Sequence, residues 1–150
     1  MEYINCTATK ITVCDDNSQQ ALIIYSGANC SIVAREYLDN HFKNWEKKLS
    51  PTNAKTLKSE SGKMTSIGTI ITETIIPNRK GNIRFNPELV VLEDFHIQGF
   101  LLGTDYQRMY GIDIYNTKNR HITIGTKKET KLSLEIYHMS NQDPLEELLN

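Results

Sequence analysis

Few residues in this sequence combine the right type with the right spacing for catalysis. Ser26 would need a histidine base and an orienting acid to act as a nucleophile, and no histidine motif accompanies it. Gly62-Lys63 is not a phosphate-binding loop, because Leu57 and Met64 fill the places that need Gly and Ser or Thr. We expect no metal and no cofactor, because the histidines and cysteines lack ligand spacing; they are His41, His96, His121, His138, Cys6, Cys14 and Cys30.

Carboxylates are the remaining side chains that can act as general acids and bases. Asp15 and Asp16 fall in a polar turn, where we expect them to be solvated. Asp105 falls at the start of a predicted short helix, where its charge meets the helix dipole favourably. Its expected role is therefore structural.

Length and composition limit the possible classes of protein. The chain has 150 residues, of which 39% are hydrophobic, and this suffices for one domain with a real core. A net charge of -1 argues against binding nucleic acid through its phosphates. No apolar stretch approaches the length of a membrane span, and the first residues lack the pattern of a secretory signal. An odd number of cysteines then indicates reduced thiols and a cytoplasmic location.

The hydrophobic pattern predicts a mainly β domain over residues 1–125. Residues 11–14 and 21–24 predict a hairpin around a polar turn of about four residues. Residues 55–76 predict a strand, a turn and a second strand, with the polar centre at residues 59–63 and the second arm over residues 67–76. Residues 89–92 and 100–102 predict two buried strands. A last hairpin is predicted from residues 112–115 and 121–124, whereas residues 126–150 are expected to be partly helical or disordered.

Two short helices are predicted between these strands. The first has Ser31 as its N-cap and ends near residues 47–49, because apolar side chains recur at helical spacing; they are Val33, Tyr37, Leu38, Phe42 and Trp45. The second lies between Thr104 and Gly111, since Thr104 and Gln107 have the spacing of a capping box and Gly111 that of a C′ glycine.

Two hydrophobic strands that each run into a glycine carry the most specific signal. Residues 21–28 read Ala-Leu-Ile-Ile-Tyr-Ser-Gly-Ala, and residues 100–105 read Phe-Leu-Leu-Gly-Thr-Asp. They resemble the retropepsin-like aspartic proteases of retroviruses and long-terminal-repeat retrotransposons. In that family a hydrophobic strand leads into Asp-Ser/Thr-Gly-Ala, and a later Leu-Leu-Gly-x-Asp leads into a short helix. Ser61-Gly62-Lys63 stands where the tip of the family's flap hairpin belongs. The resemblance covers roughly residues 11–125 and implies a closed β-barrel with a flap and two short helices.

The catalytic aspartate of this family falls on Tyr25. The family mechanism needs one carboxylate from each subunit of a homodimer, sharing a proton and activating water between them. A phenol titrates near pH 10 and is a poor general base at neutral pH, so Tyr25 is not competent for this role. Ser26 and Gly27 complete the matching loop. The other interpretation of Tyr25 is an ordinary buried aromatic residue at the end of a strand.

The resemblance implies an aspartic endopeptidase homologue from a retrotransposon polyprotein, with activity lost or very weak. Its partners would be a second copy and an extended peptide or polyprotein substrate. The residues implied in binding peptide are Ala28, Asn29, Ser61, Gly62 and Lys63; Asn29 stands where many relatives carry an acid. The alternative is a module that retains the fold and serves dimerisation or peptide binding without catalysis.

Overall fold

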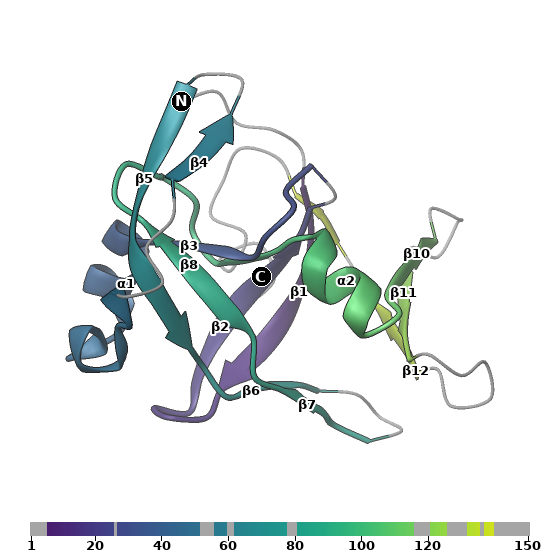
Figure 1. Cartoon of the computed structure of the whole chain (residues 1–150). Coiled ribbons are helices and arrows are strands. Elements are labelled where there is room, and N and C mark those ends of the chain that lie inside the picture. The colour runs from purple at the N-terminus through teal and green to yellow at the C-terminus, as the bar shows by residue number, and fades with distance from the viewer. Residues whose placement is uncertain are drawn as a thin grey trace.

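The computed structural model describes residues 6–25, 27–51, 56–59, 62–77, 81–115, 121–125, 132–135 and 137–139. Within these residues strands predominate, and the predicted all-β class is confirmed (Figure 1). No helix among them is both long enough and apolar enough to cross a membrane.

One curled sheet forms the body of the domain (Figure 1). Its strand order is β4-β5-β8-β3-β9-β2-β1-β6-β7, with β13 pairing on β1 as well. These strands are β1 Cys6–Val13, β2 Ser18–Ile24, β3 Ile32–Ala34, β4 Thr56–Ser59, β5 Gly62–Ile71, β6 Thr74–Ile76, β7 Ile83–Phe85, β8 Glu88–Leu92, β9 Phe100–Leu102 and β13 Tyr137–Met139. The smaller sheet of β10 Asp113–Tyr115, β11 His121–Ile124 and β12 Leu132–Glu135 lies beyond helix α2 Thr104–Met109 (Figure 1).

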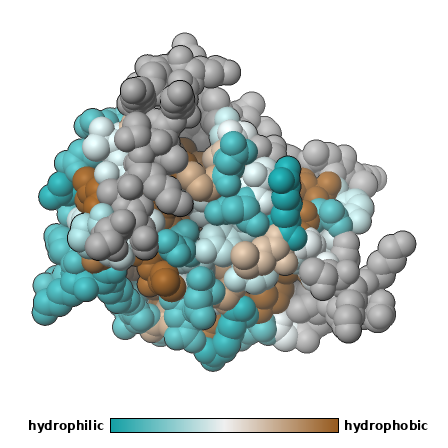
Figure 2. Space-filling model, viewed as in Figure 1, coloured by the Kyte–Doolittle hydropathy of each residue, from teal (hydrophilic) through white to brown (hydrophobic). Residues whose placement is uncertain are grey.

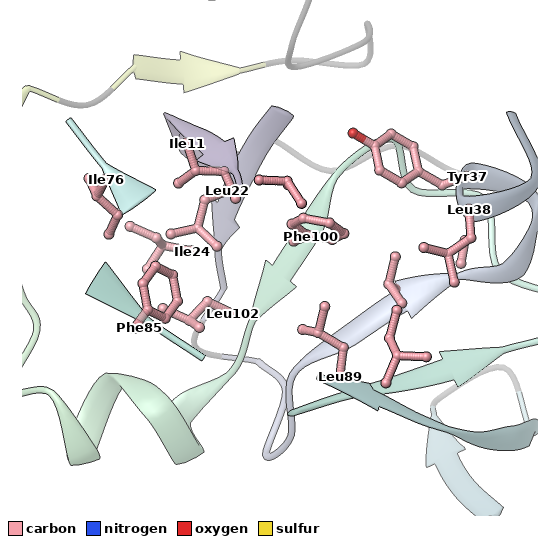
Figure 3. Packing of buried hydrophobic residues seen from close by; sticks show 14 of the residues in the cluster. Ile11, Leu22, Ile24, Tyr37, Leu38, Ile76, Phe85, Leu89, Phe100 and Leu102 are labelled. Atoms are coloured by element: carbon pink, nitrogen blue, oxygen red, sulfur yellow. The ribbon is translucent and has the colours of Figure 1, made fainter. Parts of the chain in front are cut away.

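The inner face of the curled sheet holds the core. Leu22 and Ile24 of β2, together with Phe100 and Leu102 of β9, lie at its centre and are almost fully buried. Figure 3 shows them between Ile11, Ile76 and Phe85 on one side and Tyr37, Leu38 and Leu89 on the other. Each fully buried side chain of this size contributes about 2 kcal/mol, so this cluster holds the two central strands together.

The predicted hairpin at the start of the chain is confirmed. Strands β1 and β2 pair antiparallel from Thr7↔Ile24 to Val13↔Ser18, around a four-residue turn. The continuous apolar run of β2 is buried over Gln20–Ile24, since β1 and β9 flank it in the middle of the sheet. Strands at residues 89–92 and 100–102 and the hairpin of β10 and β11 are confirmed as well.

The first predicted helix is wrong at both ends. Residues Ile32–Ala34 form β3, which pairs in parallel with β8, so the β-branched side chains there serve a strand. Helix α1 spans only Arg35–His41, and Ser31 does not cap it, because its N-cap is Ala34. The extended conformation of Phe42 (φ -131°, ψ 110°) ends the helix, and Asn44 in the left-handed conformation (φ 60°) precedes a separate 3-10 turn, η1 Trp45–Lys48.

The predicted second arm over residues 67–76 divides into two strands. β5 pairs with β4 through residues 62–65 and with β8 through residues 66–71, and a bulge between Ser66 and Gly68 marks the change of partner. β6 then pairs with β1 and β7. The sequence could not show this division, because both segments are equally rich in β-branched residues.

Beyond Gly125 the described residues form strands in place of the expected helix or disorder. β12 pairs with β11, and β13 pairs with β1, from Cys6↔Met139 to Ala8↔Tyr137. Residues 143–149, where a helical fragment was expected, lie outside the described residues. A domain boundary near residue 125 stays a prediction.

Candidate active site at the ends of two parallel strands

Strands β2 and β9 bring the two glycine-containing segments together. They pair in parallel, with Leu22 opposite Phe100, Ile23 opposite Leu101 and Ile24 opposite Leu102. Tyr25 continues this pairing by donating its backbone N–H to the Leu102 carbonyl at 3.2 Å. Segments about eighty residues apart in the chain therefore end at the same edge of the sheet.

Gly103 lies directly against the loop that follows β2. A Cβ atom at Gly103 would lie 2.4 Å from the Cys30 carbonyl oxygen and 2.9 Å from that of Ala28. The first residue of α2, Thr104, donates its backbone N–H to the Ala28 carbonyl at 2.9 Å and its hydroxyl to the same oxygen at 3.3 Å. The start of α2 and the loop after β2 thus fit closely only because residue 103 has no side chain.

Asp105 ties the start of α2 to the residue before β3. Its carboxylate accepts from the Ser31 hydroxyl at 2.9 Å, from the Ser31 N–H at 3.2 Å and from the Tyr106 N–H at 2.8 Å. The Ser31 hydroxyl accepts in turn from the Gly103 N–H at 3.0 Å. Ser31 is fully buried, so this network fixes the far end of the loop. The structural role expected for Asp105 fits these bonds.

The Tyr25 ring turns back over its own loop. A Cβ atom placed on Gly27 would lie 2.4 to 2.6 Å from the Cζ, Oη and Cε2 atoms of Tyr25, so the ring occupies the space beside Gly27. Tyr25 is half-buried and packs against the apolar group formed by Ile32, Val90, Leu92 and Leu101. Met64, from the arm of β5 that pairs with β4, packs against the same group. The base of the β4–β5 hairpin and Tyr25 therefore share one apolar patch.

Charged pairs anchor the segment that also borders this patch. Arg35 of α1 donates to both carboxylate oxygens of Glu93, at 2.9 and 3.1 Å, and His96 contacts Glu36 at 2.9 Å. The hydrogen bond to Glu93 raises the pKa of Arg35 above its ordinary value. These pairs are exposed and contribute little stability, but they join α1 to the segment whose Phe95 and Ile97 pack against the same apolar group as Tyr25.

The other site residues predicted from sequence are placed as follows. Ala28 is half-buried and Asn29 is exposed, both on the loop between β2 and β3. Gly62 and Lys63 begin β5, opposite Ser59 and Lys58 of β4. Ser26 and Ser61 lie outside the described residues. No group of three potential metal ligands occurs in the described part of the chain.

Two polar residues of the site were assigned other roles from sequence. Ser31 was expected to cap α1, and Gln107 was expected to complete a capping box with Thr104. Helix α2 begins at a Gly103 N-cap with no side-chain cap, and the Gln107 amide instead donates to the carbonyls of Tyr25 and Leu102. Local spacing could not indicate these partners, because the bonds of Ser31 and Gln107 to the other segment span 72 to 82 residues.

Solved structures match this fold, although no protein-family model and no curated protein matches the sequence. The retroviral protease-like domain of Ddi1 from Leishmania major has a TM-score of 0.60 at 15% identity, covering 91% of this chain and 95% of that chain. A retropepsin-like aspartic protease from Rickettsia conorii has a TM-score of 0.45 at 16% identity, covering 87% and 82%. EIAV protease, complexed with the inhibitor HBY-793, has a TM-score of 0.44 at 15% identity, covering 69% and 86%. The match to the Ddi1 domain, over nearly all of both chains, shows that this chain has the retropepsin-like fold.

Proposed function

We propose that this domain is a homologue of aspartic endopeptidases in which peptide hydrolysis is lost or strongly impaired, because a tyrosine occupies the catalytic position. One observation carries the proposal. Tyr25 follows β2 directly, pairs through its N–H with Leu102, and leads into Gly27 and Ala28 beside the Leu-Leu-Gly turn. In the family that the sequence resembles, the catalytic aspartate stands at this point of the loop.

Tyr25 cannot do the chemical work of a carboxylate. Aspartic proteases activate water with two carboxyl groups that share one proton, since two like charges so close cannot both ionise. A phenol is a poor general base at acidic or neutral pH. The ring is also much larger than a carboxyl group, and it already occupies the space on one side of Gly27.

The proposal extends to the ligand and the origin of the domain. An extended peptide, originally a retrotransposon polyprotein, would lie between the loop carrying Ala28 and Asn29 and the hairpin carrying Ser61, Gly62 and Lys63, as an added strand. The odd number of cysteines is typical of reduced thiols, so we place the domain in the cytoplasm. The near-neutral charge disfavours nucleic acid as a partner.

The purified chain is expected to show no pepstatin-sensitive cleavage of a peptide library between mildly acidic and neutral pH. The measurement is mass spectrometry of the digested library, with an active aspartic protease as positive control. Tyr25→Phe should behave as the unchanged chain does, because the hydroxyl has no catalytic part. Cleavage by the unchanged chain that pepstatin blocks would overturn the proposal.

A second candidate function, dimerisation without catalysis, is favoured by the surface of β10. All three residues of this edge strand are exposed, among them Ile114 at 36% and Tyr115 at 41%, and Met109 at the end of α2 is 62% exposed. Elsewhere, on the face shown in Figure 2, hydrophobic residues lie in separate patches among hydrophilic ones. Among the described strands β10 lies at the edge of its sheet and pairs with β11, and an edge strand with exposed apolar side chains is suited to pairing with a second copy.

Sedimentation velocity is expected to show a dimer whose affinity depends on Ile114. Ile114→Asp should weaken it by about 2 kcal/mol, roughly thirtyfold in Kd, because a buried charge would replace an apolar contact. Ile71→Asp is the matched control: Ile71 is 56% exposed but lies on β5, away from this surface. A chain that stays monomeric at every concentration tested would remove this second candidate.

A further inference from the structure

The hydrogen-bond ladder between β2 and β9 is interrupted at Tyr25. In a parallel pair every second residue of a strand bonds to the partner strand, donating to one residue and accepting from the residue two positions further on. Tyr25 donates to Leu102, so its own carbonyl should accept from the N–H of Thr104. Thr104 begins helix α2, however, and its N–H is bonded to the Ala28 carbonyl. The Tyr25 carbonyl is therefore left without its regular backbone donor.

The side chain of Gln107 supplies that donor. Its Nε2 lies 3.2 Å from the Tyr25 carbonyl oxygen and 2.9 Å from that of Leu102, so one amide group bonds the last carbonyls of both strands. A primary amide has two N–H donors, which is the number that two carbonyl acceptors require. Gln107 is half-buried, and this shielding strengthens both bonds relative to exposed ones.

The backbone of Gln107 joins the same point to the rest of the site. Its N–H donates to the Gly103 carbonyl at 3.2 Å, and its carbonyl accepts from the Ile112 N–H at 2.8 Å. Ile112 directly precedes β10. One residue thus links the loop after β2, the glycine turn after β9 and the segment that enters the proposed dimer surface.

We propose that Gln107 is a positioning residue. Its side-chain amide replaces the backbone hydrogen bond that the Tyr25 carbonyl lacks, and in this way it fixes the direction in which the side chain of residue 25 leaves the loop. It contacts no reacting group and acts only through the backbone of residue 25. Its effect on catalysis rests on the proposed function, whereas its effect on the loop does not.

Amide hydrogen exchange of the unchanged chain and of Gln107→Met tests the effect on the loop. Methionine keeps the length and approximate volume of glutamine but has no donor. We expect the amides of Tyr25 and residues 27–30 to exchange about tenfold faster, the size that one or two ordinary hydrogen bonds provide. The amides of Leu22 and Ile23 in the core should change their exchange rates only by as much as the global unfolding equilibrium changes. Arg108→Met, on an exposed neighbour in α2, is the matched control and should change neither set.

Two results of this exchange experiment are decisive. Unchanged exchange at Tyr25 in a folded Gln107→Met chain would overturn the proposal. A uniform acceleration over the whole chain would also overturn it, since it would reveal only a general loss of stability.

Kinetics in a Tyr25→Asp background test the effect on catalysis. Adding Gln107→Met should lower kcat about tenfold and leave KM within about twofold, because the carboxylate is misdirected while the peptide-binding surface is retained. Adding Gln107→Glu, which keeps the shape but as a carboxylate has no donor, should do the same. An unchanged kcat in both would contradict the positioning role. If Tyr25→Asp has no activity at all, the proposed function fails, and the exchange result alone decides on Gln107.

Discussion

Replacing Tyr25 with aspartate is expected to give this chain peptide hydrolysis that pepstatin blocks and that is strongest at mildly acidic pH. We expect kcat/KM to rise at least about a thousandfold above that of the unchanged chain, since removing one member of a catalytic group typically costs that much or more. The measurement is cleavage of a fluorogenic peptide by the purified variant, at concentrations that favour the dimer.

We expect a large rise in kcat/KM because the rest of the loop does not have to change. The backbone of the loop is already fixed at four points: Tyr25 to Leu102, Gln107 to Tyr25, Thr104 to Ala28, and Ser31 to Asp105. Aspartate is smaller than tyrosine, so it would also vacate the space beside Gly27 that the ring now occupies. In a symmetric dimer the two new carboxyl groups would meet, and their repulsion would make them share one proton, which explains the acidic optimum.

Two variants separate catalysis from the removal of a bulky ring. Tyr25→Asn removes the ring equally but provides no carboxylate, so it should remain inactive. Asn29→Asp adds the same charge to the same loop at an exposed position, and alone it should also remain inactive. A folded, dimeric Tyr25→Asp chain without cleavage would show that Tyr25 is not the residue that silences this domain.

The sequence predicted most of the strands near this site because their patterns are local and strong. The run from Ala21 to Ile24, flanked by a polar turn and a glycine, is typical of a buried strand. Residues 100–102 form an apolar run of the same kind. Residues 32–34 were assigned to a helix because Val33, Tyr37 and Leu38 also fit a helical period. Pairing with β8, nearly sixty residues away, decides the matter in favour of a strand.

The loop of the site was predicted, but not the side chains that hold it. The order of a hydrophobic strand and a glycine pointed to residues 25 to 29, and their role as a site stays a prediction. Ser31 and Gln107 were read as caps, because Ser at a helix start and Thr-x-x-Gln are common local patterns. Their actual acceptors and donors lie on other segments, and a single sequence contains no signal that pairs them.

Replacing Gly103 with alanine is expected to be the most destabilising small substitution at this site, at about 3 kcal/mol, measured by urea unfolding. The added methyl would meet the carbonyl of Cys30 at 2.4 Å for oxygen and 2.7 Å for carbon, and the Ala28 oxygen at 2.9 Å. All three are backbone atoms, so no side chain can move to relieve the contact. They belong to the loop whose position Thr104 and Asp105 fix, and moving the loop would break those bonds.

Gly81→Ala provides the matched control, because it separates the destabilisation that alanine causes through backbone strain from the destabilisation that it causes through steric contact. Gly81 has nothing within 4 Å of an added Cβ but has φ +136°, so alanine there should cost about 1 to 2 kcal/mol through strain alone. Gly103 has an ordinary φ of -84°, so its entire cost must come from contact between α2 and the loop. If Gly103→Ala proves no more costly than Gly81→Ala, the two glycine-containing segments do not pack as closely as the site requires. Peptide hydrolysis gained from Tyr25→Asp should also disappear in the Gly103→Ala background, since the displaced loop carries residue 25.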